Sequence, residues 1–110
     1  MLIQKIDEKQ TIKNAKELLT NYRSISRQTA FIFLKKRIGY AIAKCIEPER
    51  ELLTAKFIQK YPQTDIAIYM NLNMSESKYY RDMNAALLHF AEGYHNGELI
   101  AYSEEQTKSA

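Results

Sequence analysis

Apolar residues recur every three or four positions along most of this chain, most regularly near its C-terminal end. There the apolar positions are Tyr79, Met83, Ala86, Leu87, Phe90, Ala91 and Tyr94. This spacing places residues on one side of a helix, so it predicts an amphipathic helix whose apolar side faces a core. Ser75 can cap its first N–H groups, and Met74 and Tyr79 have the spacing of a hydrophobic staple. Asn96 and Gly97 are expected to end it, because both tolerate the left-handed conformation.

A shorter apolar segment comes directly before this helix, at residues 65–70. Asp65 can cap its start, but a helix of this length is not stable in isolation. Residues 71–74 follow as a turn with two Asn residues, which favour turn conformations. A short helix, a tight turn and a longer amphipathic helix together predict a helix-turn-helix DNA reader.

The polar side of the longer helix carries the candidate chemistry. At about 100° per residue, Ser77, Arg81 and Asn84 lie opposite the apolar stripe. Lys78 and Tyr80 lie on its two flanks. With the capping serine, the predicted DNA-binding residues are Ser75, Ser77, Lys78, Tyr80, Arg81 and Asn84.

Each of these residue types has a role in DNA recognition. Arg81 could bind guanine O6 and N7, and Asn84 could pair with adenine N6 and N7. Ser75, Lys78 and Tyr80 could hold phosphates that set the register. A polar helix face is usually only solvated, but here the donors gather in the first three turns behind a short helix and a tight turn. We therefore favour DNA contact.

Three further helices are expected in the N-terminal half, at residues 6–22, at 27–45 and from Pro48 to about Lys60. The second is apolar around more of its circumference than one partner helix would cover. Other helices of the fold or a second subunit could cover the excess, and we favour burial within the fold.

The composition fits an all-α fold, a helical bundle with a C-terminal helix-turn-helix. The chain has 110 residues with three Gly and two Pro, and no segment requires a strand. We divide it into an N-terminal helical hairpin for packing or oligomerisation (1–46), a helix-turn-helix DNA-binding unit (47–102) and a polar, mobile tail (103–110).

The net charge of +3 is too small to argue for nucleic acid by itself, but its distribution is uneven. Between Arg27 and Lys60 there are eight basic residues against three acidic ones. Such a stretch beside a reading helix could hold the DNA backbone. For residues 35–37, a solvated helix surface is an equal alternative.

Other function classes find no support in the sequence. Cys45 is a lone thiol in an apolar run, which excludes an internal disulfide, fits a reducing cytoplasm and predicts a small core residue. His89 and His95 have no carboxylate or Cys partner at metal spacing, so we expect no metal site. We also expect no cofactor, no small-molecule ligand, no catalytic motif, no signal peptide and no membrane span.

The tract at residues 73–99 resembles the C-terminal motif of the ArpU-type regulators of Gram-positive phages and prophages. The matching positions are Ser75, Ser77, Tyr79, Tyr80, Arg81, Ala86, Leu87, Leu88, Phe90, Ala91, Glu92, Gly97, Glu98 and Leu99. The resemblance implies a transcriptional regulator of late phage genes such as packaging and lysis, acting in a bacterial cytoplasm. It also implies a helix-turn-helix similar to the fourth region of bacterial sigma factors.

The helix pattern, the polar helix face and the family resemblance together predict a protein that binds double-stranded DNA sequence-specifically and is not an enzyme. Host RNA polymerase and a second copy of the chain are further candidate partners. One rival is a protein-interaction module that docks on RNA polymerase through the apolar second helix. Another is a small terminase subunit, which would form a closed ring detectable by light scattering.

Overall fold

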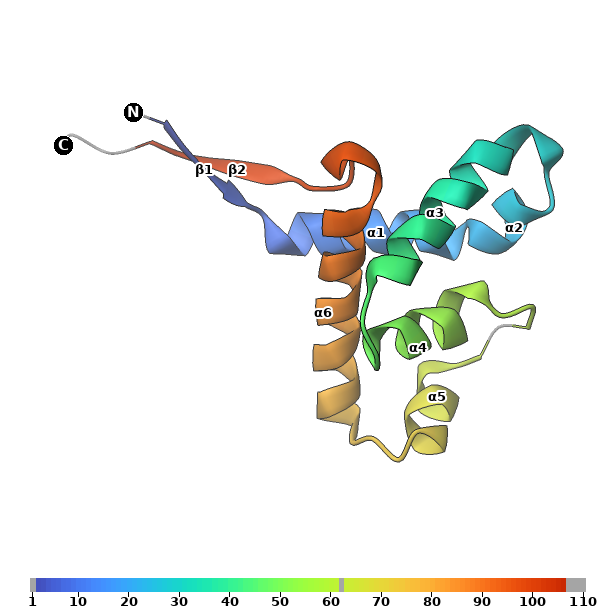
Figure 1. The fold of residues 1–110 in the computed structure, drawn as a ribbon. Helices are drawn as coiled ribbons and strands as arrows, with labels where there is room; N and C mark the ends of the chain where they lie inside the picture. Colours follow the sequence, from blue (N-terminus) through green and yellow to red (C-terminus); the bar gives the residue numbers. More distant parts are fainter. Residues whose placement is uncertain (1, 62, 107–110) are drawn as a thin grey trace.

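The computed structural model describes residues 2–61 and 63–106, and most of them are helical (Figure 1). The helices are α1 (Glu8–Thr20), α2 (Tyr22–Ser26), α3 (Ile32–Lys44), α4 (Glu49–Leu53), α5 (Asp65–Asn71) and α6 (Glu76–Gly93). Short turns of other helix types are η1 (Thr29–Phe31), η2 (Thr54–Ile58) and η3 (His95–Gly97). The predominantly helical fold confirms the expected class.

Helix α6 is the central element of the fold. In Figure 1, α1 crosses it near its C-terminal end, while α5 lies beside its N-terminal end. The Ser75 hydroxyl accepts a hydrogen bond from the Lys78 backbone N–H at 3.2 Å, which confirms Ser75 as the N-cap. The predicted apolar stripe is buried as far as Ala91, and Tyr94 is buried just beyond the helix.

The end of α6 differs from the expectation. The helix stops at Gly93, because Tyr94 adopts an extended conformation with φ −79° and ψ 137°. The Lys44 ammonium donates to the Gly93 carbonyl at 3.2 Å, which satisfies a terminal acceptor. Asn96 and Gly97 have positive φ, as expected, but they shape the following turn η3.

The buried residues of both halves form one cluster. It comprises Ala15, Leu19, Ile25, Ile38, Ala41, Ile42, Cys45, Leu52, Leu53, Phe57, Ile68, Tyr79, Met83, Ala86, Leu87, Phe90, Ala91 and Tyr94. The N-terminal helices therefore pack on the same core as α5 and α6. Cys45 belongs to this core as predicted, and burial raises the pKa of its thiol.

The predicted helices of the N-terminal half are divided more finely than the pattern indicated. The expected helix over 6–22 begins after Asp7, whose carboxylate accepts from the Gln10 N–H at 3.1 Å, and it ends before Asn21. The expected helix over 27–45 starts regular α-helix only at Ile32, after the 3₁₀ turn η1. The third helix continues from α4 into η2, a π-helical turn.

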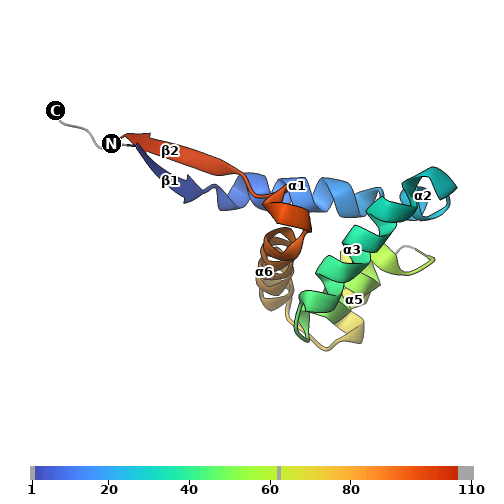
Figure 2. The same ribbon diagram turned by 45° about the horizontal axis from the view of Figure 1, so that its top comes forward.

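A two-stranded antiparallel ribbon was not expected from the sequence. Strand β1 (Leu2–Ile6) pairs with β2 (Tyr102–Gln106), with Ile6 opposite Tyr102 (Figure 2). The predicted mobile tail was therefore wrong for residues 103–106, while 107–110 lie outside the described residues. Thr11 and Ala101 anchor the ribbon, since the Ala101 N–H donates to the Thr11 hydroxyl at 2.9 Å.

Helix α3 is only half covered, so the interpretation that the fold buries its apolar excess was wrong. Ile38, Ala41 and Ile42 face the core, as does the following Cys45. We use the name exposed apolar face of α3 for the exposed apolar side chains of this helix and its flanks, which are Phe31, Ile32, Phe33, Tyr40 and Ile46, and the last three are 72%, 68% and 70% exposed. Among the described residues, no helix has both the length and the apolar character needed to cross a bilayer.

Candidate nucleic-acid interface

Helix α5 is held at its start by Thr64 rather than by Asp65. The Thr64 hydroxyl accepts a hydrogen bond from the Ala67 N–H at 3.1 Å, so Thr64 is the N-cap and the prediction for Asp65 was wrong by one position. This shift frees the Asp65 carboxylate for tertiary contacts. The helix then runs to Asn71 and buries Ile68.

The turn between α5 and α6 is closed by a defined set of backbone hydrogen bonds. The Met74 N–H donates to the Tyr69 carbonyl at 2.8 Å, and the Asn73 N–H donates to the Met70 carbonyl at 3.2 Å. Together with φ 55° at Asn73, these bonds form a Schellman motif, which ends a helix in a left-handed residue. Ser75, the N-cap of α6, directly follows this motif, so no further loop residue separates the two helices.

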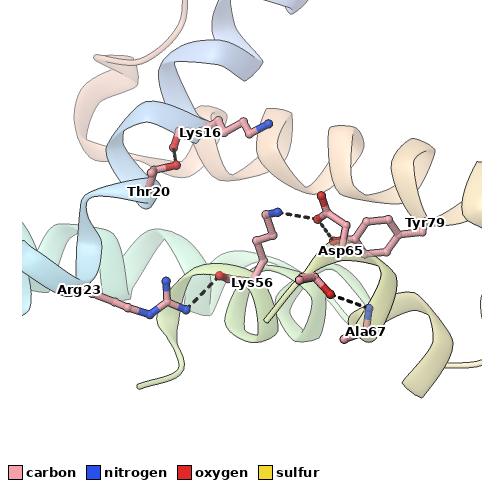
Figure 3. A network of polar contacts seen from close by, with 8 residues as sticks. Lys16, Thr20, Arg23, Lys56, Asp65, Ala67 and Tyr79 are labelled. Atoms are coloured by element: carbon pink, nitrogen blue, oxygen red, sulfur yellow. Dashed lines mark hydrogen bonds and ion pairs between the residues drawn. The ribbon is translucent and has the colours of Figure 1, made fainter. Parts of the chain in front are cut away.

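A partly buried polar network fixes α6 relative to α5 and η2 (Figure 3). The Asp65 carboxylate accepts hydrogen bonds from the Tyr79 hydroxyl and the Lys56 ammonium, both at 2.6 Å. Burial alone would raise the pKa of Asp65, but the bonds from Lys56 and Tyr79 outweigh it and lower that pKa. Burial and the neighbouring Asp65 carboxylate raise the pKa of Tyr79, so its hydroxyl stays a donor.

Helix α2 also holds the end of η2. The Arg23 guanidinium donates to the Lys56 carbonyl at 3.1 Å (Figure 3). It also donates to the Gln59 carbonyl at 2.7 Å. These carbonyls lie where the helical hydrogen bonding of η2 ends, and such acceptors need partners from outside the helix. Arg23 therefore supports the segment that carries Lys56 to Asp65.

All six predicted DNA-binding side chains are exposed, as their spacing indicated. Five lie in the first half of α6 and Ser75 caps it. The side chains of Ser77, Arg81 and Asn84 form no hydrogen bond or ion pair with another described residue. Their donors and acceptors are therefore available to a ligand.

Three of the six residues have partners on the protein, and one of them is Ser75, whose hydroxyl caps α6. The Lys78 ammonium forms an ion pair with Asp82 at 2.7 Å, one turn further along α6. The Tyr80 ring packs edge-on against Tyr79, with centroids 5.1 Å apart. Partial burial and then the charge of Asp65 raise the pKa of Tyr80, so its hydroxyl also stays protonated at neutral pH.

Sequence reasoning missed the lysines of α1 that lie beside this face. A groove of about 270 Å³ runs between α1 and α6, and we call it the α1–α6 groove. Its lining residues are Lys9, Ile12, Lys13, Lys16, Lys56, Phe57, Asp65, Tyr80, Met83, Asn84 and Leu87. The spacing of Lys9, Lys13 and Lys16 would have placed them on one helix face, but nothing local shows which helix that face adjoins.

The basic residues of α3 lie elsewhere. Arg37 and Tyr40 share a hollow with Lys44, Gly93 and His95, at the C-terminal end of α6. The predicted reader residues are at the opposite end of that helix. Arg37 is thus separated from them along α6, whereas Lys56 from the same basic stretch is tied to Asp65.

His89 has a carboxylate partner that its sequence neighbours do not reveal. Its Nδ1 lies 2.8 and 2.7 Å from the two carboxylate oxygens of Glu49, which is 40 positions away. This contact ties α4 to α6, and it could not be expected from the sequence spacing of His89, which was considered only for metal ligands. Among the described residues, no group of three or more His, Cys, Asp or Glu side chains is arranged to hold a metal ion.

Comparisons of the chain with protein-family models, curated proteins and solved structures found no significant match. The function has to be inferred from the interface itself. Its strongest features are an exposed polar helix face, rigid support beneath that face, and lysines alongside it.

Proposed function

We propose that this chain is a transcriptional regulator that binds double-stranded DNA in a sequence-specific manner and places the first half of α6 in the major groove. The observation that carries this proposal is the exposure of six hydrogen-bonding side chains on and before that half-helix. The resemblance of residues 73–99 to ArpU-type regulators adds control of late phage genes in a bacterial cytoplasm. It also adds a fold like the fourth region of sigma factors.

The chemistry of the face suits base reading. The major groove is about 12 Å wide and admits one α-helix. Arg81 and Asn84 are one turn apart on α6, so they can reach neighbouring base pairs, with Arg81 on guanine and Asn84 on adenine. Because neither side chain has an intramolecular partner among the described residues, DNA binding would break no existing contact of theirs.

The remaining polar residues suit the DNA backbone. Ser75 and Ser77 lie at the positive end of α6, where backbone N–H groups and the helix dipole favour phosphate. Lys78 and the protonated Tyr80 hydroxyl supply further donors. These contacts would set the register of the helix and leave sequence discrimination to Arg81 and Asn84.

The fixed position of α6 favours sequence-specific base recognition over non-specific binding to DNA phosphates. Tyr79 lies among the candidate residues in sequence, yet its side chain points inward and is bonded to Asp65. The backbone of α6 is thereby fixed to α5 and η2. Bidentate base contacts require this kind of fixed geometry, whereas non-specific phosphate binding does not.

The experiment is selection of bound duplexes from a random DNA pool at near-physiological salt, with the wild-type chain and Arg81→Ala in parallel. We expect a defined motif that blurs at one base pair in the variant, with a loss of about 1–3 kcal/mol at the selected site. Lys78→Ala is the matched control, and it should weaken all sequences alike. An equal loss on every sequence for Arg81→Ala would remove that residue as a reader.

A second candidate function is protein docking, which the exposed apolar face of α3 favours. Phe33, Tyr40 and Ile46 are each about 70% exposed, and Phe33 and Tyr40 lie two turns apart on one side of α3. An apolar protein contact should persist as salt rises, whereas DNA binding should weaken steeply. If the selection yields no motif and binding is insensitive to salt, protein docking becomes the better-supported function.

A further inference from the structure

We propose that Lys9, Lys13 and Lys16 of α1 bind backbone phosphates of the duplex that α6 reads, an inference that rests on the proposed function. The three lysines line the α1–α6 groove together with two predicted DNA-binding residues, Tyr80 and Asn84. This shared groove brings a second helix, 60 or more residues away in the chain, to the edge of the reading face.

The lysines form a single cationic row. They occupy positions i, i+4 and i+7 of α1, so their side chains leave the helix on one face. At 1.5 Å per residue the row spans about 10.5 Å, so its cations are spaced to contact successive phosphates of one strand. Their ammonium groups form no hydrogen bond or ion pair with another described residue.

Glu17 lies with Lys13 and Lys16 at a neighbouring hollow, but it does not line the α1–α6 groove. Asp65 is the carboxylate among its lining residues, and it is already bonded to Lys56 and Tyr79. In Figure 3 the Lys16 side chain extends from α1 above the Lys56–Asp65 pair. The groove therefore presents excess positive charge at the flank of α6.

Geometry favours DNA over a small anion as the occupant. A helix in the major groove is flanked on both sides by phosphate backbones, and the flank carrying Tyr80 and Asn84 is the one that faces the α1 lysines. The groove follows α1 from Lys9 to Lys16, so its cations are spread along a line and do not surround one point. A continuous strand of phosphates matches a row of three cations better than a single anion does.

The test is the salt dependence of binding to the selected duplex, for the wild-type chain and for a Lys9→Gln/Lys13→Gln/Lys16→Gln variant. Each lost phosphate contact should reduce the slope of log K against log salt by about 0.9, or about 2.7 for all three. The selected motif should stay the same, because these lysines do not read bases. Circular dichroism and urea unfolding of the variant would establish that the fold is retained.

The matched control is Lys35→Gln/Lys36→Gln/Lys60→Gln, which removes the same charge from exposed sites that do not line the α1–α6 groove. We expect the slope of log K against log salt for this control to differ from the wild-type slope by less than about 0.9, the value of one phosphate contact. A wild-type slope in the α1 variant, or an equal drop in the control, would overturn the assignment while leaving α6 as a reader. If the wild-type chain binds no duplex but binds vesicles containing phosphatidylserine, both this inference and the proposed function fail.

Discussion

The Tyr79 hydroxyl donates a 2.6 Å hydrogen bond to the Asp65 carboxylate, which joins the two helices on either side of the tight turn. Tyr79 lies on the inner side of α6, directly before Tyr80 on its outer side. The buried Tyr79 therefore fixes α6 to α5, whereas the adjacent Tyr80 lies on the outer side of α6. Substitutions of the two tyrosines therefore test the support beneath the proposed DNA-binding face of α6.

Tyr79→Phe should destabilise the fold by about 1 kcal/mol. The substitution keeps the buried ring and removes only the hydrogen bond to Asp65, which retains Lys56 as a partner. Urea unfolding followed by circular dichroism would measure the change. Tyr80→Phe is the matched control, and its unfolding midpoint should change less than that of Tyr79→Phe, because the Tyr80 side chain is 43% exposed. If both variants unfold at the wild-type midpoint, the Tyr79–Asp65 bond contributes nothing to stability.

The same network predicts a dependence of stability on acid pH. The pKa of Asp65 is lowered in the folded chain. The ionised carboxylate therefore contributes fully to the free energy of unfolding above the ordinary Asp pKa of about 3.9, and this contribution is lost as the pH falls through the lowered pKa of the folded chain. The stability difference between wild type and Asp65→Asn should therefore be constant from pH 7 to about pH 5 and shrink below about pH 4. Unfolding midpoints at a series of pH values would show this. A difference that persists unchanged at about pH 2 would contradict it.

The turn makes a separate prediction at Asn73. Its φ of 55° lies in the left-handed region, which costs an ordinary L-residue about 1–2 kcal/mol and costs Gly nothing. Asn73→Ala should lower the free energy of unfolding by about 1 kcal/mol, whereas Asn73→Gly should leave it unchanged or raise it. Asn71→Ala, at a helical position two residues earlier, is the control and should be neutral. Equal stability of the Ala and Gly variants at position 73 would argue against the Schellman turn.

Local signals in the sequence were sufficient for the parts of the interface that depend on neighbours in the chain. The Ser75 cap, the apolar stripe of α6 and the exposure of Arg81 all follow from helical spacing within about 20 residues. The Thr64 cap was missed because Thr and Asp are both good caps and stand side by side. Only the tertiary bonds of Asp65 distinguish their roles.

Features that depend on distant residues could not be predicted in this way. The pairing of β1 with β2 joins the two ends of the chain, and its residues carry no strong alternation. The contact of His89 with Glu49 and the position of the α1 lysines beside Asn84 likewise depend on how whole helices pack. Periodicity gives the buried face of each helix but not its neighbour.

The exposed apolar face of α3 predicts that two copies of the chain associate. Phe33 and Ile46 lie about equally far before and after Gly39 and Tyr40, and a Cβ added at Gly39 would meet nothing within 4 Å. An antiparallel pairing of α3 with a second copy about a twofold axis would cover Phe33 and Tyr40, which lie two turns apart on one side of the helix. Two reading helices related by that axis would favour a palindromic site.

Sedimentation equilibrium over a range of concentrations would measure this association. We expect the wild-type chain to reach the dimer mass and Phe33→Ser/Tyr40→Ser to remain at the monomer mass with an unchanged unfolding midpoint, because both side chains are exposed. Ile66→Ser/Met70→Ser removes two similarly exposed apolar side chains from α5 and serves as the control, which should still dimerise. A wild-type chain that stays monomeric at every concentration would exclude the pairing. A dimer lost equally in both variants would place the contact elsewhere than on α3.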